Sequence, residues 1–110
     1  METVQITQEL WKANQQLKKD DEFLNKHAID KATTEKLYRK ALAKKIIELR
    51  DQKIPATLIN DLAKGDEEVS EYRFARDLAR VMYDVAKSSQ RSAETQISSL
   101  QSILKHQTDV

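Results

Sequence analysis

The sequence predicts an all-α protein, a long antiparallel helical hairpin resembling a coiled coil, with a short helix at the bend. Of 110 residues, 34% are charged and 39% hydrophobic, a balance common in long helices. The chain has one proline, Pro55, and one glycine, Gly65, too few for the turns of a β protein. On either side of them, apolar residues recur at steps of three and four. We therefore expect a single helical domain over residues 1–110.

The first long helix is expected over about residues 7–52. Its buried face is marked by a stripe with helical spacing. The acidic run at 20–22 and Asp30 interrupt this stripe, which indicates a kink or fraying there. The stripe consists of Leu10, Ala13, Leu17, Leu24, Ala28, Lys31, Tyr38, Leu42, Ile46 and Leu49.

The short helix is expected over about residues 56–64. Pro55 suits the first turn of a helix. Gly65 suits the position just after a helix, where a positive φ costs glycine little. We expect this helix to turn Leu58, Ile59 and Leu62 inward and Gly65 to have a positive φ.

The second long helix is expected over about residues 67–107. Asp66 can cap its start, and the acidic residues that follow suit the positive end of the helix dipole. Its stripe consists of Ala75, Leu78, Ala79, Met82, Val85, Ala86, Ser89, Ala93, Ile97, Leu100 and Leu104.

The pairing of the two stripes predicts a register. If the hairpin is symmetric about the middle of the short helix, residues facing each other have numbers that sum to about 121. Leu42 then meets Ala79, and many large residues meet small ones. Two pairs fit poorly, because Asp21 faces Leu100 and Glu35 faces Ala86, so the local register there stays open.

Charge and composition exclude several classes of protein. The net charge of +1 gives no global attraction for nucleic acid or acidic membranes. The chain has no cysteine, which excludes disulfides and thiolate metal sites. It has no apolar signal core and no apolar run near 18 residues, so we expect a cytoplasmic protein that does not insert into membranes.

No residue pattern indicates catalysis. A single glycine cannot form a phosphate-binding loop, and no nucleophile motif is present. His27 and His106 are far apart in the expected hairpin and are interpreted as solvated side chains rather than metal ligands. We expect no catalytic residue, cofactor or metal, and no enzyme activity.

A basic cluster near the bend is the first candidate site. Residues 36–53 carry a net charge of +5, and arginines follow on the second long helix. Acidic residues are interleaved, so a solvated charged face is the favoured interpretation and nucleic-acid contact the alternative. The candidate contacts are Lys36, Lys40, Lys44, Arg73, Arg76 and Arg80.

A surplus of apolar residues near the bend is the second candidate site, because one seam between two helices does not need them all. Either the short helix folds back over them, or they form a dimer or partner interface. The candidate interface residues are Leu37, Ile47, Phe74, Val81 and Val85. We expect the second arrangement, with a homodimer.

Three segments carry a family resemblance. They begin at Lys36 (KLYRKALAKKI), Ile54 (IPATLINDLAKG) and Tyr72 (YRFARDLA). The chain over about residues 10–105 resembles small helical proteins from the early regions of phages and prophages of Gram-positive bacteria. The resemblance rests on structural positions and implies no catalytic residue. It implies a setting among replication, recombination and anti-defence genes, in the cytoplasm of a bacterial host.

The resulting functional hypothesis is a non-catalytic, phage-type helical protein that works by binding protein. Its partners would be itself, as a dimer, and an unidentified protein. It would be an accessory to phage DNA metabolism or an inhibitor of a host defence or nucleic-acid-processing protein. The alternative is a nucleic-acid-binding accessory module that uses the basic surface near the bend.

Overall fold

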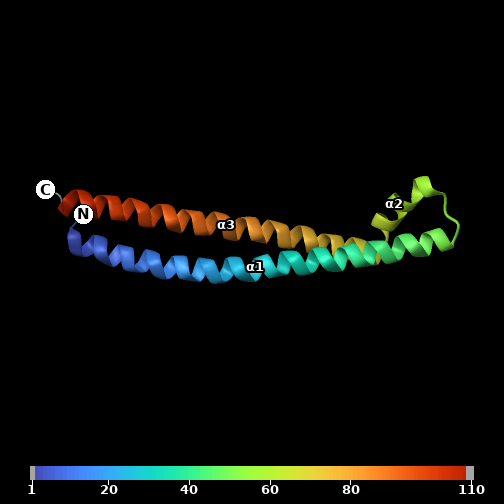
Figure 1. Ribbon diagram of the computed structural model, residues 1–110, viewed down its shortest axis with the longest axis horizontal. Coiled ribbons are helices and arrows are strands. Elements are labelled where there is room, and N and C mark those ends of the chain that lie inside the picture. Colours follow the sequence, from blue (N-terminus) through green and yellow to red (C-terminus); the bar gives the residue numbers. More distant parts are fainter. Residues whose placement is uncertain (1, 109–110) are drawn as a thin grey trace. The chain divides into compact units, whose positions relative to one another are not determined.

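The computed structural model describes residues 2–108, which form three α-helices and no strand within that range (Figure 1). Helix α1 covers Thr3–Asp51, α2 covers Ala56–Gly65 and α3 covers Glu67–Thr108. The all-α hairpin with a short helix at the bend is therefore confirmed. Helix α1 begins at Thr3 rather than near residue 7 and continues through the acidic run at 20–22. Among the described helices, none is long and apolar enough to span a membrane.

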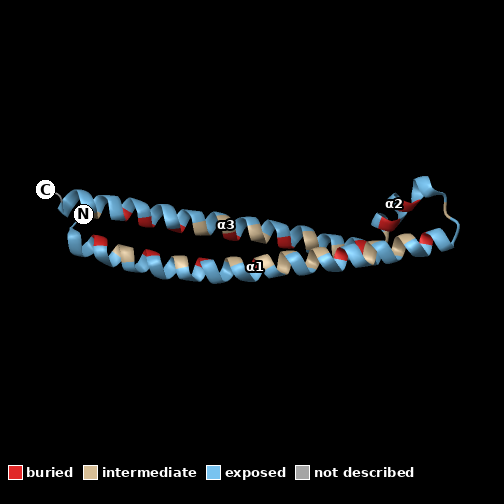
Figure 2. Ribbon diagram, in the orientation of Figure 1, coloured by how far each residue is buried: buried red, intermediate tan, exposed pale blue. Residues whose placement is uncertain are grey.

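The described chain divides into two compact units. The bend unit is Ala28–Met82, which holds the end of α1, all of α2 and the start of α3. The terminal unit holds the described residues up to His27 and those from Tyr83 onward. In each unit a stretch of α1 runs antiparallel to a stretch of α3, and the buried residues lie on the sides that face each other (Figure 2).

The core of the terminal unit is apolar at one end and polar at the other. Ile6, Ala13, Ile97 and Leu100 form its apolar cluster. Asp20 is only 6% exposed and accepts hydrogen bonds from Gln16 Nε2 and Ser89 Oγ, each at 3.1 Å. A buried carboxylate is tolerated here because polar groups satisfy its oxygens.

The core of the bend unit forms where α2 folds back onto the last turns of α1 (Figure 1). Leu49, Ile59 and Ala63 are its buried members. The prediction that Leu58 and Leu62 turn inward with Ile59 is wrong, since both are about half exposed. A ten-residue helix that packs on one partner buries only one narrow face, and Ile59 and Ala63 occupy it.

The chain reverses direction immediately after α1, through a Schellman cap. Lys53 N–H donates to the Arg50 carbonyl at 2.9 Å, and Ile54 N–H donates to the Leu49 carbonyl at 3.2 Å. This pattern requires a left-handed residue at the penultimate position, and Lys53 supplies it with φ of 63°. Ile54 packs against the cluster that contains Leu49, which is the apolar contact that accompanies such a cap.

Gly65 does not have the positive φ that the sequence predicted. It is the last residue of α2, and the chain leaves the helix through Asp66, whose φ and ψ of −60° and 139° are extended. Asp66 then caps α3 as expected, because its Oδ2 accepts a hydrogen bond from Val69 N–H at 3.2 Å. Asp66 both follows the last residue of α2 and caps α3. The two helices are therefore joined by this single extended residue, without a left-handed turn at Gly65.

The predicted register is also wrong. Polar contacts across the hairpin include Asp20 with Ser89, Asp21 with Gln90, Glu35 with Arg76, and Lys45 with Asp66. In both units the partners' numbers sum to about 110 rather than about 121. The centre of symmetry is therefore near Pro55, at the chain reversal, and not in the middle of α2.

The backbone conformations of Lys53 and Gly65 predict a stabilising substitution at each position. Lys53→Gly should raise the free energy of unfolding by about 1 kcal/mol, because it relieves a left-handed lysine. Gly65→Ala should raise it by about 0.5 kcal/mol, because a Cβ there meets nothing within 4 Å and alanine favours helix. Urea denaturation followed by circular dichroism measures both. A loss of stability in Gly65→Ala would support the left-handed glycine instead.

Candidate functional site

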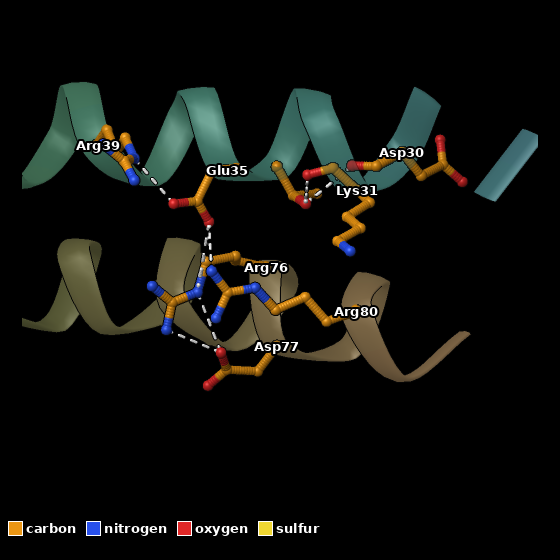
Figure 3. A network of polar contacts seen from close by, with 8 residues as sticks. Asp30, Lys31, Glu35, Arg39, Arg76, Asp77 and Arg80 are labelled. Carbon is orange, nitrogen blue, oxygen red and sulfur yellow. Dashed lines mark hydrogen bonds and ion pairs between the residues drawn. The ribbon is translucent and has the colours of Figure 1, made fainter. Parts of the chain in front are cut away.

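The bend unit contains an ion-pair network centred on Glu35 of α1 (Figure 3). Its carboxylate lies 2.8 Å from Arg39 Nε on the same helix. Across the hairpin it lies 3.0 Å from an Arg80 guanidinium nitrogen and 3.8 Å from Arg76 Nε. One carboxylate thus contacts three arginines and ties α1 to α3.

Arg76 is held most firmly in this network. Its side chain is only 14% exposed, and its guanidinium carbon lies 4.4 Å from the ring centroid of the buried Tyr38. Asp77 receives two hydrogen bonds from the same guanidinium, at 2.8 and 3.0 Å. The stacked, paired cation joins the two helices as a structural element.

The network shifts the acidity of its members. The hydrogen bond from Arg39 lowers the pKa of Glu35, against the effect of desolvation, and the charges of Arg80 and Arg76 lower it further. Desolvation opposes the charged form of Arg76, but the hydrogen bond and charge of Asp77 outweigh it and raise the pKa of Arg76. Both groups therefore stay charged over a wide range of pH.

The basic residues predicted from the sequence do not form one surface. Arg76 and Arg80 are engaged by Glu35 on one flank of the hairpin. Lys36 and Lys40 are exposed and make no ion pair with any described residue. Helical spacing from the buried Tyr38 places both lysines on the outer face of α1, away from α3.

Two further members of the basic set, Arg73 and Lys44, are not engaged by Glu35. Arg73 is exposed and makes no ion pair within residues 2–108. Lys44 is exposed at the end of the lysine row and also lines a depression at the start of α3. The predicted cations thus form two rows, Lys36, Lys40 and Lys44 on α1 and Arg73, Arg76 and Arg80 on α3.

The apolar candidates are all exposed, and α2 covers none of them. Their exposed fractions are 43% for Leu37, 59% for Ile47, 66% for Phe74, 58% for Val81 and 52% for Val85. The alternative in which the short helix folds over this surplus is thus excluded, because α2 packs on Leu49 and its neighbours instead.

These residues lie on two different faces. Phe74, Leu78 and Val81 follow each other at steps of four and three on the side of α3 opposite the buried Val69 and Ala79. We call this set the α3 apolar row. Val85 continues the spacing along α3 within the terminal unit. Ile47 lies on the outer face of α1, directed away from the α3 side.

The depression at the start of α3 has a volume of about 520 Å³. Its lining includes Lys45, which lies 3.3 Å from Asp66 and 3.6 Å from Glu48. The hydrogen bond with Asp66 raises the pKa of Lys45, and the Val69 N–H, followed by Lys45, lowers the pKa of Asp66. Both shifts move away from neutrality, whereas acid–base catalysis favours a pKa close to the working pH.

The prediction that both histidines are solvated holds for only one of them. His106 is exposed, as expected for a solvated side chain. His27 is 8% exposed and packs edge-to-face on Phe23, with 4.2 Å between ring centroids, so the solvated interpretation is wrong for it. No group of three His, Cys, Asp or Glu side chains suited to a metal ion occurs among the residues described here.

Sequence reasoning missed the polar contacts that join the helices. Its register placed Glu35 opposite Ala86 and Asp21 opposite Leu100, and both pairs were recognised as poor. An offset chosen to place these two acids opposite polar residues would have brought Glu35 to Arg76 and Asp21 to Gln90.

Comparison of the chain with protein-family models, with curated proteins and with solved structures gives no match.

The network predicts a pH-dependent contribution from Glu35. Because its pKa is lower in the folded chain than the ordinary 4.5, the ionised carboxylate stabilises the fold above that pH. The contribution disappears as pH falls through the folded-state pKa. Glu35→Gln should therefore have a lower melting temperature than the wild type at pH 7, and the two should converge as the pH falls below 4.5 and through the lowered folded-state pKa.

Glu94→Gln is the matched control, since Glu94 lies on the exposed surface of α3 outside this network. Thermal melts of both variants from pH 7 to pH 2.5 separate the effects. An equal, pH-independent change in the two variants would show that the Glu35 network does not stabilise the hairpin.

Proposed function

We propose that this is a non-catalytic, phage-type helical protein that acts by binding another protein through the α3 apolar row. The observation that carries the proposal is the exposure of Phe74, Leu78 and Val81, at 66%, 51% and 58%, on one face of one helix. Helix-borne anchors at such spacing are a common means of protein recognition.

The energetics favour burial of this row in a complex. Each Å² of apolar surface removed from water contributes about 25 cal/mol, so an exposed phenylalanine flanked by two aliphatic side chains is a strong source of binding energy. Aromatic side chains are also enriched among the residues that dominate interfaces. The paired state of Arg76 and Arg80 supports the protein-binding interpretation, since both cations are already occupied within the chain.

The biological setting of this proposal comes from the family resemblance. On that basis the protein is an accessory to phage DNA metabolism or an inhibitor of a host protein, acting in the cytoplasm of a bacterial host. The α3 apolar row is the contact in either role.

Site-specific cross-linking in bacterial cells tests the proposal. A photo-cross-linking residue at Val81 should give a discrete protein adduct, whereas one at the exposed Gln101 of α3 should give none. Phe74→Glu should abolish the Val81 adduct, because it replaces the one aromatic anchor of the row with a charge. Absence of an adduct at Val81, or equal adducts at both positions, would refute the proposed surface.

Nucleic-acid binding through the exposed cations Lys36, Lys40 and Arg73 is the rival function. We expect no sequence-specific or tight binding at physiological salt, because the net charge is +1 and two of the six candidate cations are paired. Fluorescence anisotropy with labelled DNA and RNA measures this. Sub-micromolar binding that weakens steeply with salt and disappears in Lys36→Glu/Lys40→Glu would favour the rival.

A further inference from the structure

The outer face of α1 in the bend unit carries a row of like charges. Lys36, Lys40 and Lys44 follow one another at steps of four residues, and all three are exposed. Lys44 also lines the depression at the start of α3, among acidic residues. Lys36 and Lys40 have no acidic residue three or four positions away on α1, and neither makes an ion pair with any described residue. These two cations are therefore left without a counter-charge in the described part of the chain.

This lysine row lowers the stability of α1. Like charges four residues apart on a helix repel each other, whereas an acid four residues before a base stabilises the helix. The same helix uses the stabilising arrangement nearby, where Glu35 lies 2.8 Å from Arg39. The fold thus gives no reason for the row, which points to a counter-charge supplied by another molecule.

Large aliphatic side chains share this face with the lysines. Leu37 is 43% exposed, Ile29 67% and Ile47 59%. Ile29 lies seven residues before Lys36, and Ile47 lies seven residues after Lys40, so the isoleucines extend the line of the lysines in both directions. The face is therefore basic and apolar at once.

We propose that the outer face of α1 in the bend unit docks an acidic amphipathic helix of another protein. Carboxylates of this helix pair with Lys36 and Lys40, and its aliphatic side chains cover Leu37 and the flanking isoleucines. A helix fits because acids at steps of four residues repeat at the same spacing as the lysines, about 6 Å. This face is separate from the α3 apolar row, so the inference goes beyond the proposed function and does not depend on it.

The aliphatic residues favour a peptide over other polyanions. A nucleic-acid backbone pairs with cations but leaves neighbouring aliphatic side chains in water. An anionic bilayer binds helices whose apolar and basic residues lie on different sides, whereas here they alternate within one narrow face. An acidic amphipathic helix offers both kinds of contact from a single side.

Binding of a defined peptide tests the inference. The probe is a labelled helical peptide of about four turns, with leucines on its contact face and glutamates there at steps of four residues. The full chain should bind it saturably in fluorescence anisotropy, and the affinity should fall with added salt. Lys36→Glu/Lys40→Glu should weaken binding by about tenfold or more, and should bind instead a probe with lysines in place of the glutamates.

Lys18→Glu/Lys19→Glu is the matched control, with the same charge change on the exposed surface of α1 outside the bend unit. It should bind the acidic probe like the wild type. Leu37→Gln keeps every charge and should also weaken binding, because an aliphatic contact is lost.

The melting temperature gives a second readout. Lys40→Glu places an acid four residues from a lysine on each side, so its melting temperature should rise while its affinity for the acidic probe falls. Opposite changes in one variant exclude misfolding as the cause of lost binding. A lower melting temperature would show that the lysine row serves the fold and would remove the reason for the inference.

Two further results would overturn the inference. One is the absence of saturable binding to the acidic probe, or an equal loss of binding in the matched control. The other is tighter binding of labelled DNA, RNA or phosphatidylglycerol vesicles than of the probe, unchanged in Leu37→Gln, which would assign the row to a phosphate-bearing partner. The Val81 cross-link reports on the α3 apolar row alone, so failure of one proposal is distinguishable from failure of the other.

Discussion

The point at which α1 ends controls the rest of the structure. The Schellman cap at Lys53 and Ile54 reverses the chain within a few residues and places α2 on the last turns of α1. Because α2 lies along α1 in this way, α3 begins about two turns back from the end of α1. That offset brings Asp66 to Lys45 and Glu35 to Arg76. The left-handed conformation of Lys53 is the local strain that the cap tolerates in exchange for the apolar contact made by Ile54.

The helices could be predicted from the sequence, but the register could not be obtained from apolar spacing. Three-and-four periodicity, the single proline and the Asp66 cap are local properties, and they placed all three helices. A shift of about eleven residues equals about three helical turns and returns every stripe residue to the same side of its helix. The predicted and observed registers differ by about that shift, so both satisfy the stripe. Polar contacts distinguish them, because a carboxylate such as Asp20 or Glu35 is tolerated only opposite a suitable partner.

The residues of the candidate surfaces could be predicted from the sequence. Which of them share one side of a helix could not. Exposed apolar residues such as Phe74 and Val81 were identified because one seam does not require them. Ile47 lies on a different face from these residues, and the lysine row lies on a different face from Arg76. Both facts depend on which side of α1 packs against α3. That property follows from the register. The engagement of Arg76 by Tyr38 and Glu35 is a tertiary contact, and no local pattern in the sequence indicates it.

The composition of the seam explains why large apolar residues lie outside. The buried positions of α3 include Ala79 in the bend unit and Ala86 and Ala93 in the terminal unit, at intervals of seven residues. Alanine lets two helices approach closely, but each one removes little apolar surface from water. The seam thus allows close pairing of the two helices but contributes only modest stability. Polar contacts between α1 and α3 help to fix their register. Phe74, Leu78 and Val81, which would stabilise a seam far more, are exposed on the other side of α3. The α3 apolar row therefore contributes little to the fold, and its burial in a complex would add stability that the seam lacks.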